Sequence, residues 1–223
     1  MIDRFYLYRF EIFLSTQIAV LFGSLFFPDI FFEDTILPVI YLISILAGIL
    51  IISKNKIILR LFIGLFIIAA FIFGSDLIYG TKDSDNFLIR LLVYFIFYII
   101  VTLNIIKQVW QSQRVSKKVI LGLMSGYISL GFLAFFLFMS IELLTPGAFT
   151  ASEVVTGFNE SMSSDNILYY AFITLLTIGY GEITPVIPIA QKAAVLVGLL
   201  GQFYLVIITA VVVEKYIMDN KNS

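Results

Sequence analysis

Residues 174–185 read Thr-Leu-Leu-Thr-Ile-Gly-Tyr-Gly-Glu-Ile-Thr-Pro, and their centre is suited to hold a dehydrated cation. Such a cation needs several oxygens around it, and backbone carbonyls supply oxygens without adding a full negative charge. For successive carbonyls to point the same way, alternate residues must take conformations that favour glycine, because a Cβ atom penalises positive φ. Gly179 and Gly181 flank Tyr180 at this spacing, and Thr177 adds a hydroxyl oxygen beneath the carbonyls.

The tripeptide Gly-Tyr-Gly alone would be weak evidence, because it also suits a turn between two apolar helices. Here it lies within the longer pattern Thr-x-x-Thr-x-Gly-Tyr-Gly-Glu, after a short apolar segment and before a long one. This context favours a cation-binding backbone over a simple turn.

The composition indicates a membrane protein. Of the 223 residues, 61% are hydrophobic and 13% are charged, whereas soluble domains carry about a quarter charged residues. The chain contains no His and no Cys, which excludes disulfides, thiolate metal sites and His- or Cys-dependent catalysis. With a net charge of −1 and no sizeable basic patch, nucleic-acid binding is not indicated. The absence of a nucleophile–base pair in the apolar segments argues against an enzyme.

Six segments are long and apolar enough to cross a bilayer, which takes about 20 residues. They are residues 5–27, 36–53, 57–79, 87–106, 119–144 and 188–216. The apolar stretch 167–176 is too short to cross, so we expect a re-entrant helix there, capped at its start by Asp165 and Asn166. The expected fold class is therefore all-α integral membrane, with six transmembrane helices and one re-entrant helix.

The distribution of basic residues predicts the orientation of this topology. Eleven of the fourteen Lys and Arg residues fall on one side, and the other three are Lys82, Arg90 and Lys192. Because Lys and Arg accumulate in cytoplasmic loops, we expect both termini in the cytoplasm and residues 177–181 near the outer surface.

The pentapeptide 177–181, Thr-Ile-Gly-Tyr-Gly, resembles the selectivity filter of the tetrameric potassium channels. Over a little under half of the chain, residues 119–216 resemble the two-helix pore module of that family. The resemblance implies a homotetramer, because one filter segment supplies one wall of a four-fold pore and the chain has no internal repeat. It implies a lipid bilayer as environment and no cofactor besides permeant K⁺ ions. The implied filter residues, of which the first four coordinate K⁺, are Thr177, Ile178, Gly179, Tyr180 and Gly181.

The resemblance also implies residues that support the filter. Tyr169 and Tyr170 stand where the family often has aromatics behind the filter, although ordinary interfacial tyrosines would fit equally. Thr174 and Glu182 flank the pentapeptide as further support. Some members carry a carboxylic acid four residues before the filter threonine, and this chain has Ile173 there, so Glu182 lacks that partner.

A hinge glycine often follows the filter in this family, and Gly201 lies twenty residues after Gly181, with Gly198 three residues before it. The alternative is close helix packing, for which membrane helices also use small residues. Gln202 and Thr209 are polar exceptions on the same helix, and each either lines the cavity or bonds a neighbouring helix.

By helix count the chain resembles six-helix potassium channels, in particular small bacterial ones without a regulatory domain. A voltage-sensing fourth helix carries arginines at every third position, whereas residues 87–106 contain only Arg90. We expect Arg90 to pair with Asp76 and voltage dependence to be shallow. The predicted domains are a four-helix membrane domain, a cytoplasmic linker and a pore domain, at residues 1–110, 111–118 and 119–223.

Together these features predict a passive potassium-selective channel in the cell membrane. A less selective cation channel, or a subunit of an ion-coupled transporter, is one alternative. A non-conducting regulatory or sensor subunit with a vestigial pore is another, but the intact pentapeptide argues against it.

Overall fold

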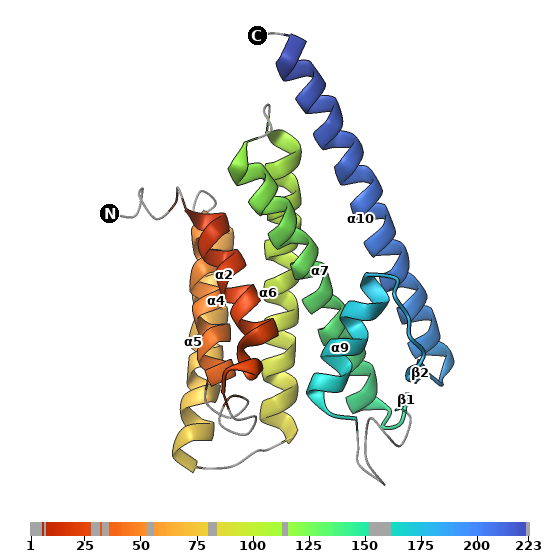
Figure 1. Cartoon of the computed structure of the whole chain (residues 1–223). Coiled ribbons are helices and arrows are strands. Elements are labelled where there is room, and N and C mark those ends of the chain that lie inside the picture. Colours follow the sequence, from red (N-terminus) through yellow and green to blue (C-terminus); the bar gives the residue numbers. More distant parts are fainter. Residues whose placement is uncertain are drawn as a thin grey trace. The chain divides into compact units, whose positions relative to one another are not determined.

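The computed structural model describes residues 6, 8–27, 32, 36–52, 56–79, 84–112, 116–151 and 162–221, without the side chains of residues 75–79, 84–87, 215, 216 and 218–221. In this part of the chain most residues are helical (Figure 1). The chain divides into two compact units, Met1–Ile128 (unit 1) and Ser129–Ser223 (unit 2).

Each unit consists mainly of helices. Those of unit 1 are α2 (Arg9–Phe22), the 3₁₀ turn η1 (Gly23–Leu25), α4 (Leu37–Ile52), α5 (Lys56–Tyr79) and α6 (Ser84–Gln111). Helix α7 (Lys117–Leu144) contributes its first turns to unit 1 and its remainder to unit 2. Unit 2 adds β1 (Phe149–Ala151), α9 (Ser164–Leu175), β2 (Ile183–Pro185) and α10 (Pro188–Lys221).

Four helices of the described residues are long and apolar enough to cross a membrane, in agreement with an all-α membrane protein. They cover Lys56–Gly74, Leu88–Gln111, Lys117–Leu144 and Pro188–Glu214, and they match the third to sixth predicted spans. The first two predicted spans are shorter helices here, α2 with 14 residues and α4 with 16. Because a crossing helix needs about 20 residues, the total of six spans stays a prediction.

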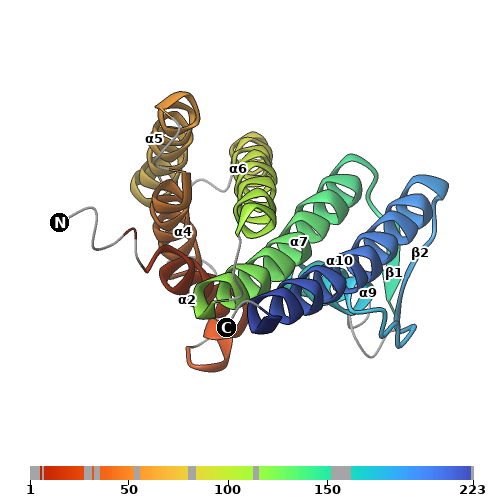
Figure 2. The ribbon, with the colours of Figure 1, turned by 90° about the horizontal axis from the view of Figure 1, so that it is seen from above.

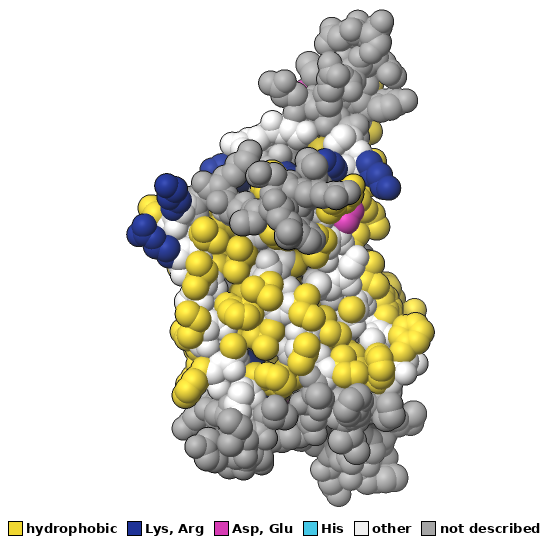
Figure 3. Space-filling view, turned by 90° about the vertical axis from the view of Figure 1, so that its left-hand side faces the viewer, with side chains coloured by type: hydrophobic (Ala, Val, Ile, Leu, Met, Phe, Trp, Pro, Cys, Tyr) yellow, Lys and Arg dark blue, Asp and Glu magenta, His cyan; other side chains and the backbone are white. Residues whose placement is uncertain are grey.

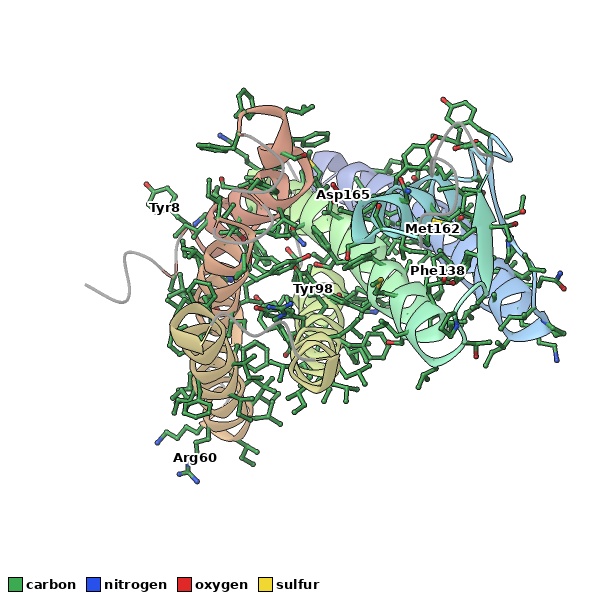
Figure 4. All side chains as sticks on the ribbon, turned by 90° about the horizontal axis from the view of Figure 1, so that it is seen from below. Tyr8, Arg60, Tyr98, Phe138, Met162 and Asp165 are labelled. Carbon is green, nitrogen blue, oxygen red and sulfur yellow. The ribbon has the colours of Figure 1, made fainter. Side chains whose placement is uncertain are left out.

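Aromatic side chains fill the interior of unit 1. Phe13, Phe62 and Phe97 are completely buried, and the Phe97 ring lies 5.2 Å from that of Phe62 and 6.2 Å from that of Phe13. Gly48 on α4 makes room for this cluster, since a Cβ atom there would come within 2.6 Å of the Phe97 ring. Tyr98, also fully buried, lies among the same helices (Figure 4).

Polar side chains join the helices of unit 1 at two places. Ser125 Oγ donates a hydrogen bond to Gln17 Oε1 over 2.8 Å, and Gln17 Nε2 donates to the Ser125 carbonyl over 3.1 Å. Arg9 Nε donates to Gln108 Oε1 over 3.1 Å, and Gln108 Nε2 donates to the Ile51 carbonyl over 2.9 Å. These bonds satisfy polar groups that a hydrocarbon environment would leave without partners.

The outward side of α5 is apolar. Its exposed side chains include Ile57, Leu61, Ile67 and Phe71, and such side chains form a broad hydrophobic band in Figure 3. Lysine and arginine side chains gather along one edge of this band. A band of this kind is what a helix presents to lipid.

Some predictions fall where the structure does not test them. The side chain of Asp76 lies outside the described residues, so its pairing with Arg90 stays a prediction. The predicted linker includes residues 113–115, which are also outside the described part. The cytoplasmic position of both termini stays a prediction as well.

Candidate functional site

Helix α9 leads into the pentapeptide 177–181, and its N-cap residue is a serine. Ser163 is the N-cap residue, and its hydroxyl accepts a hydrogen bond from the Asn166 backbone N–H over 3.2 Å. The prediction that Asp165 and Asn166 cap this helix is therefore wrong by two to three residues. Asp165 instead lies in the first turn, where a negative charge suits the helix dipole.

Helix α9 has 12 residues and is therefore about 18 Å long, too short for a hydrocarbon core of about 30 Å. It packs beside α10 (Figure 2) and against α7 within unit 2. The ring of Phe172 lies edge-on to Phe132 with 5.7 Å between centroids. Gly131 allows this approach, because a Cβ atom at residue 131 would overlap the Phe172 ring.

Tyr170 and Tyr169 face different surroundings on α9. Tyr170 is buried, and its ring centroid lies 5.1 Å from that of Phe138 on α7 (Figure 4) and 5.3 Å from that of Phe149 on β1. It thus links α9 to α7 and β1.

Tyr169 is exposed, and its hydroxyl lies beside the carboxylate of Glu182, just past the pentapeptide. The interaction with this carboxylate is the main reason that the pKa of Tyr169 is raised to about 12. Desolvation, the negative charge of Glu182 and the neighbouring Tyr180 raise this pKa further. Although Ile173 cannot pair with Glu182, α9 therefore still places a hydroxyl beside that carboxylate.

Every second residue of the pentapeptide has a positive φ angle. Thr177, Gly179 and Gly181 have φ of 57°, 57° and 92°, and among the described residues with a Cβ atom only Thr177 has positive φ. For Thr177 this left-handed conformation costs roughly 1–2 kcal/mol, so the surrounding structure must impose it. The alternation is the one that successive carbonyls need in order to point the same way.

Backbone hydrogen bonds connect the start of the pentapeptide to the end of α9. The N–H of Thr177 donates to the Thr174 carbonyl over 3.0 Å, and that of Ile178 donates to the Ile173 carbonyl over 2.9 Å. In the described part of the chain, no backbone hydrogen bond is donated to the carbonyls of residues 177–181. These two N–H groups thus anchor the pentapeptide to α9, while its carbonyl oxygens accept no backbone hydrogen bond from the described residues.

A small sheet holds the far end of the pentapeptide. Strands β1 and β2 pair antiparallel, with Phe149 opposite Pro185 and Ala151 opposite Ile183, and the Val186 N–H donates to the Ala148 carbonyl over 2.8 Å. Sequence reasoning missed this sheet, because three-residue strands with no alternating pattern give no recognisable signal.

Glu142, near the end of α7, fixes the turn that leads into β1. Its buried carboxylate accepts hydrogen bonds from the backbone N–H groups of Gly147, over 2.9 Å, and Phe149, over 3.1 Å. Sequence reasoning also missed this residue. A carboxylate within an apolar helix, five residues before a glycine, was the available signal.

Helix α10 contacts the pentapeptide and α9 through two neighbouring residues. Gly201 is buried against α9, where a Cβ atom would overlap the Leu175 carbonyl oxygen. Gln202 Nε2 donates a hydrogen bond to Thr177 Oγ1 over 3.0 Å. Gly198 has open space within the chain, and the Thr209 hydroxyl donates to Leu205 of its own helix over 2.7 Å.

What the pentapeptide offers a cation is therefore mainly backbone oxygens. The described residues contain no group of three or more Asp, Glu, His or Cys side chains that could hold a metal ion. Residues 177–181 are exposed in the single chain, with Ile178 47% and Tyr180 72% exposed. A column of carbonyls on one chain covers only one side of a cation.

Comparison with known proteins finds one similarity. Residues 126–218 match a protein-family model described as "Ion channel", and this region contains α9, the pentapeptide and most of α10. It covers less than half of the chain and supports passive ion conduction as the activity of this region. No curated protein and no solved structure matches the chain significantly.

Proposed function

We propose that the protein is a potassium-selective channel that assembles as a homotetramer and lets K⁺ pass down its gradient. The observation that carries this proposal is the alternation of positive φ at Thr177, Gly179 and Gly181. It supports a column of carbonyl oxygens that replaces the hydration shell of a permeating ion. Potassium is the ion for which the resembling filters are selective.

Four copies are proposed because a dehydrated cation needs oxygens on every side. The pentapeptide is exposed in one chain, and α10 exposes apolar residues such as Leu199, Phe203 and Val206 beside it. Both features are expected of surfaces that face the pore or a neighbouring copy. The C-terminal end of α9 directs partial negative charge toward the start of the pentapeptide, which favours a cation there.

In this proposal the protein lies in the cell membrane with both termini in the cytoplasm, as the Lys and Arg distribution indicates. The supports act at both ends of the filter. Tyr169 and Glu182 hold its outer end to α9, Tyr170 and Thr174 stabilise α9 from within, and Gly201 is the candidate hinge.

Reconstitution into planar bilayers tests the function. With K⁺ on one side and Na⁺ on the other, the reversal potential should approach that of K⁺, Rb⁺ should permeate, and Ba²⁺ should block. Equal permeability to K⁺ and Na⁺ would instead indicate the less selective cation channel. A crosslinked tetramer that conducts nothing would indicate the regulatory subunit, and a stable monomer or dimer as sole species would refute the four-fold pore.

Two glycine variants distinguish an effect on the proposed filter from a general effect of replacing glycine by alanine. Gly179→Ala should abolish selective current, because a Cβ atom at φ of 57° disturbs the carbonyl orientation. Gly64→Ala is the matched control, since Gly64 lies within α5 with no atom near the added Cβ. It should conduct like the wild type.

A further inference from the structure

Gln202 is placed beside the first oxygen of the proposed filter. Its side chain is exposed within the single chain, and its Nε2 lies 3.0 Å from Thr177 Oγ1. The sequence left two interpretations of Gln202, that it lines the cavity or that it bonds a neighbouring helix. The structure shows a different contact. Gln202 bonds a residue of the pentapeptide itself.

The hydrogen bonds of Thr177 determine which atom is the donor. The Thr177 hydroxyl donates its proton to the Leu176 carbonyl over 2.7 Å. A hydroxyl has one proton and two lone pairs, so toward Gln202 it acts as the acceptor. The amide N–H therefore occupies one lone pair of Thr177 Oγ1, and one lone pair is left for a cation.

We infer that Gln202 is an affinity-setting residue for cations at the Thr177 end of the filter, and that it weakens their binding. An N–H group has its positive end toward the hydroxyl oxygen, and that polarity opposes a cation bound to the same oxygen. The inference rests on the proposed function, and in a tetramer the effect acts four times on one ion. Weak binding suits conduction, because an ion must leave each position as well as enter it.

The ligand class is a cation that fits the carbonyl cage, and Ba²⁺ is a useful probe because its double charge makes binding visible as block. Gln202→Leu removes the N–H donor without adding charge. Gln202→Glu keeps the shape, removes the donor and adds negative charge. Ba²⁺ added to both sides of reconstituted wild-type and variant channels should block Gln202→Leu at about tenfold lower concentration, and Gln202→Glu at lower concentration still.

Thr209→Val is the matched control on the same helix, because the Thr209 hydroxyl bonds only its own helix among the contacts found. Its half-blocking Ba²⁺ concentration should stay within about twofold of the wild type, the scatter expected of a neutral change. Crosslinking of each variant verifies the tetramer before block is measured. If Gln202→Leu does not assemble, the isosteric Gln202→Glu decides.

A double-mutant cycle with Thr177→Val tests the pathway of the effect. Without the hydroxyl, Gln202→Leu should no longer change Ba²⁺ block. The inference would be overturned if Ba²⁺ block were unchanged or weaker in Gln202→Leu and Gln202→Glu. It would also be overturned if Gln202→Leu changed Ba²⁺ block equally in the Thr177→Val background. A wild type without K⁺-selective current would instead refute the proposed function, and with it the inference.

Discussion

The backbone carbonyl of Leu175 lies directly against Gly201, so that a Cβ atom at residue 201 would overlap its oxygen. The same Cβ would also come within 3.2 Å of the Leu175 side chain. Leu175 is the last residue of α9, and Gly201 lies in the first half of α10. The missing side chain at residue 201 thus sets how close α10 comes to the helix that leads into the pentapeptide.

Gly201→Ala should therefore destabilise the packing of α10 on α9 even if no hinge exists. Inserting a methyl group into a packed contact typically costs about 1–3 kcal/mol, and here it meets backbone, which cannot move aside as a side chain does. The measurement is the midpoint of dissociation of the proposed tetramer in a denaturing detergent series.

Gly198→Ala is the control for this prediction, because a Cβ at residue 198 meets no atom of the chain within 4 Å. In a helix, Ala is favoured over Gly by about 1 kcal/mol, so Gly198→Ala should be neutral or stabilising. If Gly201→Ala keeps full stability and only lowers open probability, the hinge explains Gly201 better than packing.

Glu142 should be required for the stability of the turn between α7 and β1. Replacing it by Ala leaves the N–H groups of the exposed Gly147 and the buried Phe149 without their acceptor, and the loss at the buried Phe149 N–H costs about 1–3 kcal/mol. Glu142→Gln retains one acceptor oxygen and should lose less. Thermal unfolding in detergent provides the measurement.

Thr150→Val serves as the control for Glu142. The hydroxyls of Thr150 and Thr184 lie 3.3 Å apart on the exposed side of the small sheet. Their loss should change stability by no more than about 0.5 kcal/mol, as is usual for surface positions. Equal losses in Glu142→Ala and Thr150→Val would contradict a special role of the carboxylate.

Features that depend on local chemistry could be predicted from the sequence. Runs of apolar residues predicted the four long helices, and the spacing of Gly179 and Gly181 predicted where φ is positive. Thr177 also adopts positive φ, which its residue type opposes, and the bond that its hydroxyl accepts from Gln202 of α10 is a tertiary contact. Contacts between residues distant in sequence, such as Gln202 with Thr177 or Gly201 with Leu175, leave no periodic signal.

The interaction of the Tyr169 hydroxyl with the Glu182 carboxylate should make stability fall at alkaline pH. Tyrosine has an ordinary pKa of about 10, and that of Tyr169 is raised to about 12. A raised pKa means that the neutral hydroxyl is favoured in the folded protein, so its stabilising effect is complete below pH 10 and is lost between about pH 10 and 12. Tyr169→Phe lacks this contribution throughout. The difference in melting temperature between wild type and Tyr169→Phe should be constant up to pH 10 and then shrink.

The chain contains eleven other tyrosines, so the comparison with Tyr169→Phe is essential. Tyr8→Phe, on an exposed side chain at the start of α2, provides a second reference. It should leave the alkaline loss intact. If the melting temperatures of wild type and Tyr169→Phe changed in parallel up to pH 12, the contact of Tyr169 with Glu182 would contribute nothing to stability.

Voltage should open the proposed channel only weakly. In the candidate span Leu88–Gln111 the basic residues are Arg90 and Lys107, two residues from one end and four from the other. Moving one elementary charge across the membrane is worth about 2.3 kcal/mol per 100 mV, and dedicated sensors move three or four charges per subunit. Charges near the ends of a span cross only part of the field. Conductance–voltage curves in symmetric K⁺ should therefore be shallow and change little in Arg90→Gln. A slope equivalent to more than about four charges per tetramer would contradict this prediction and require Lys107 or Arg114 to enter the field.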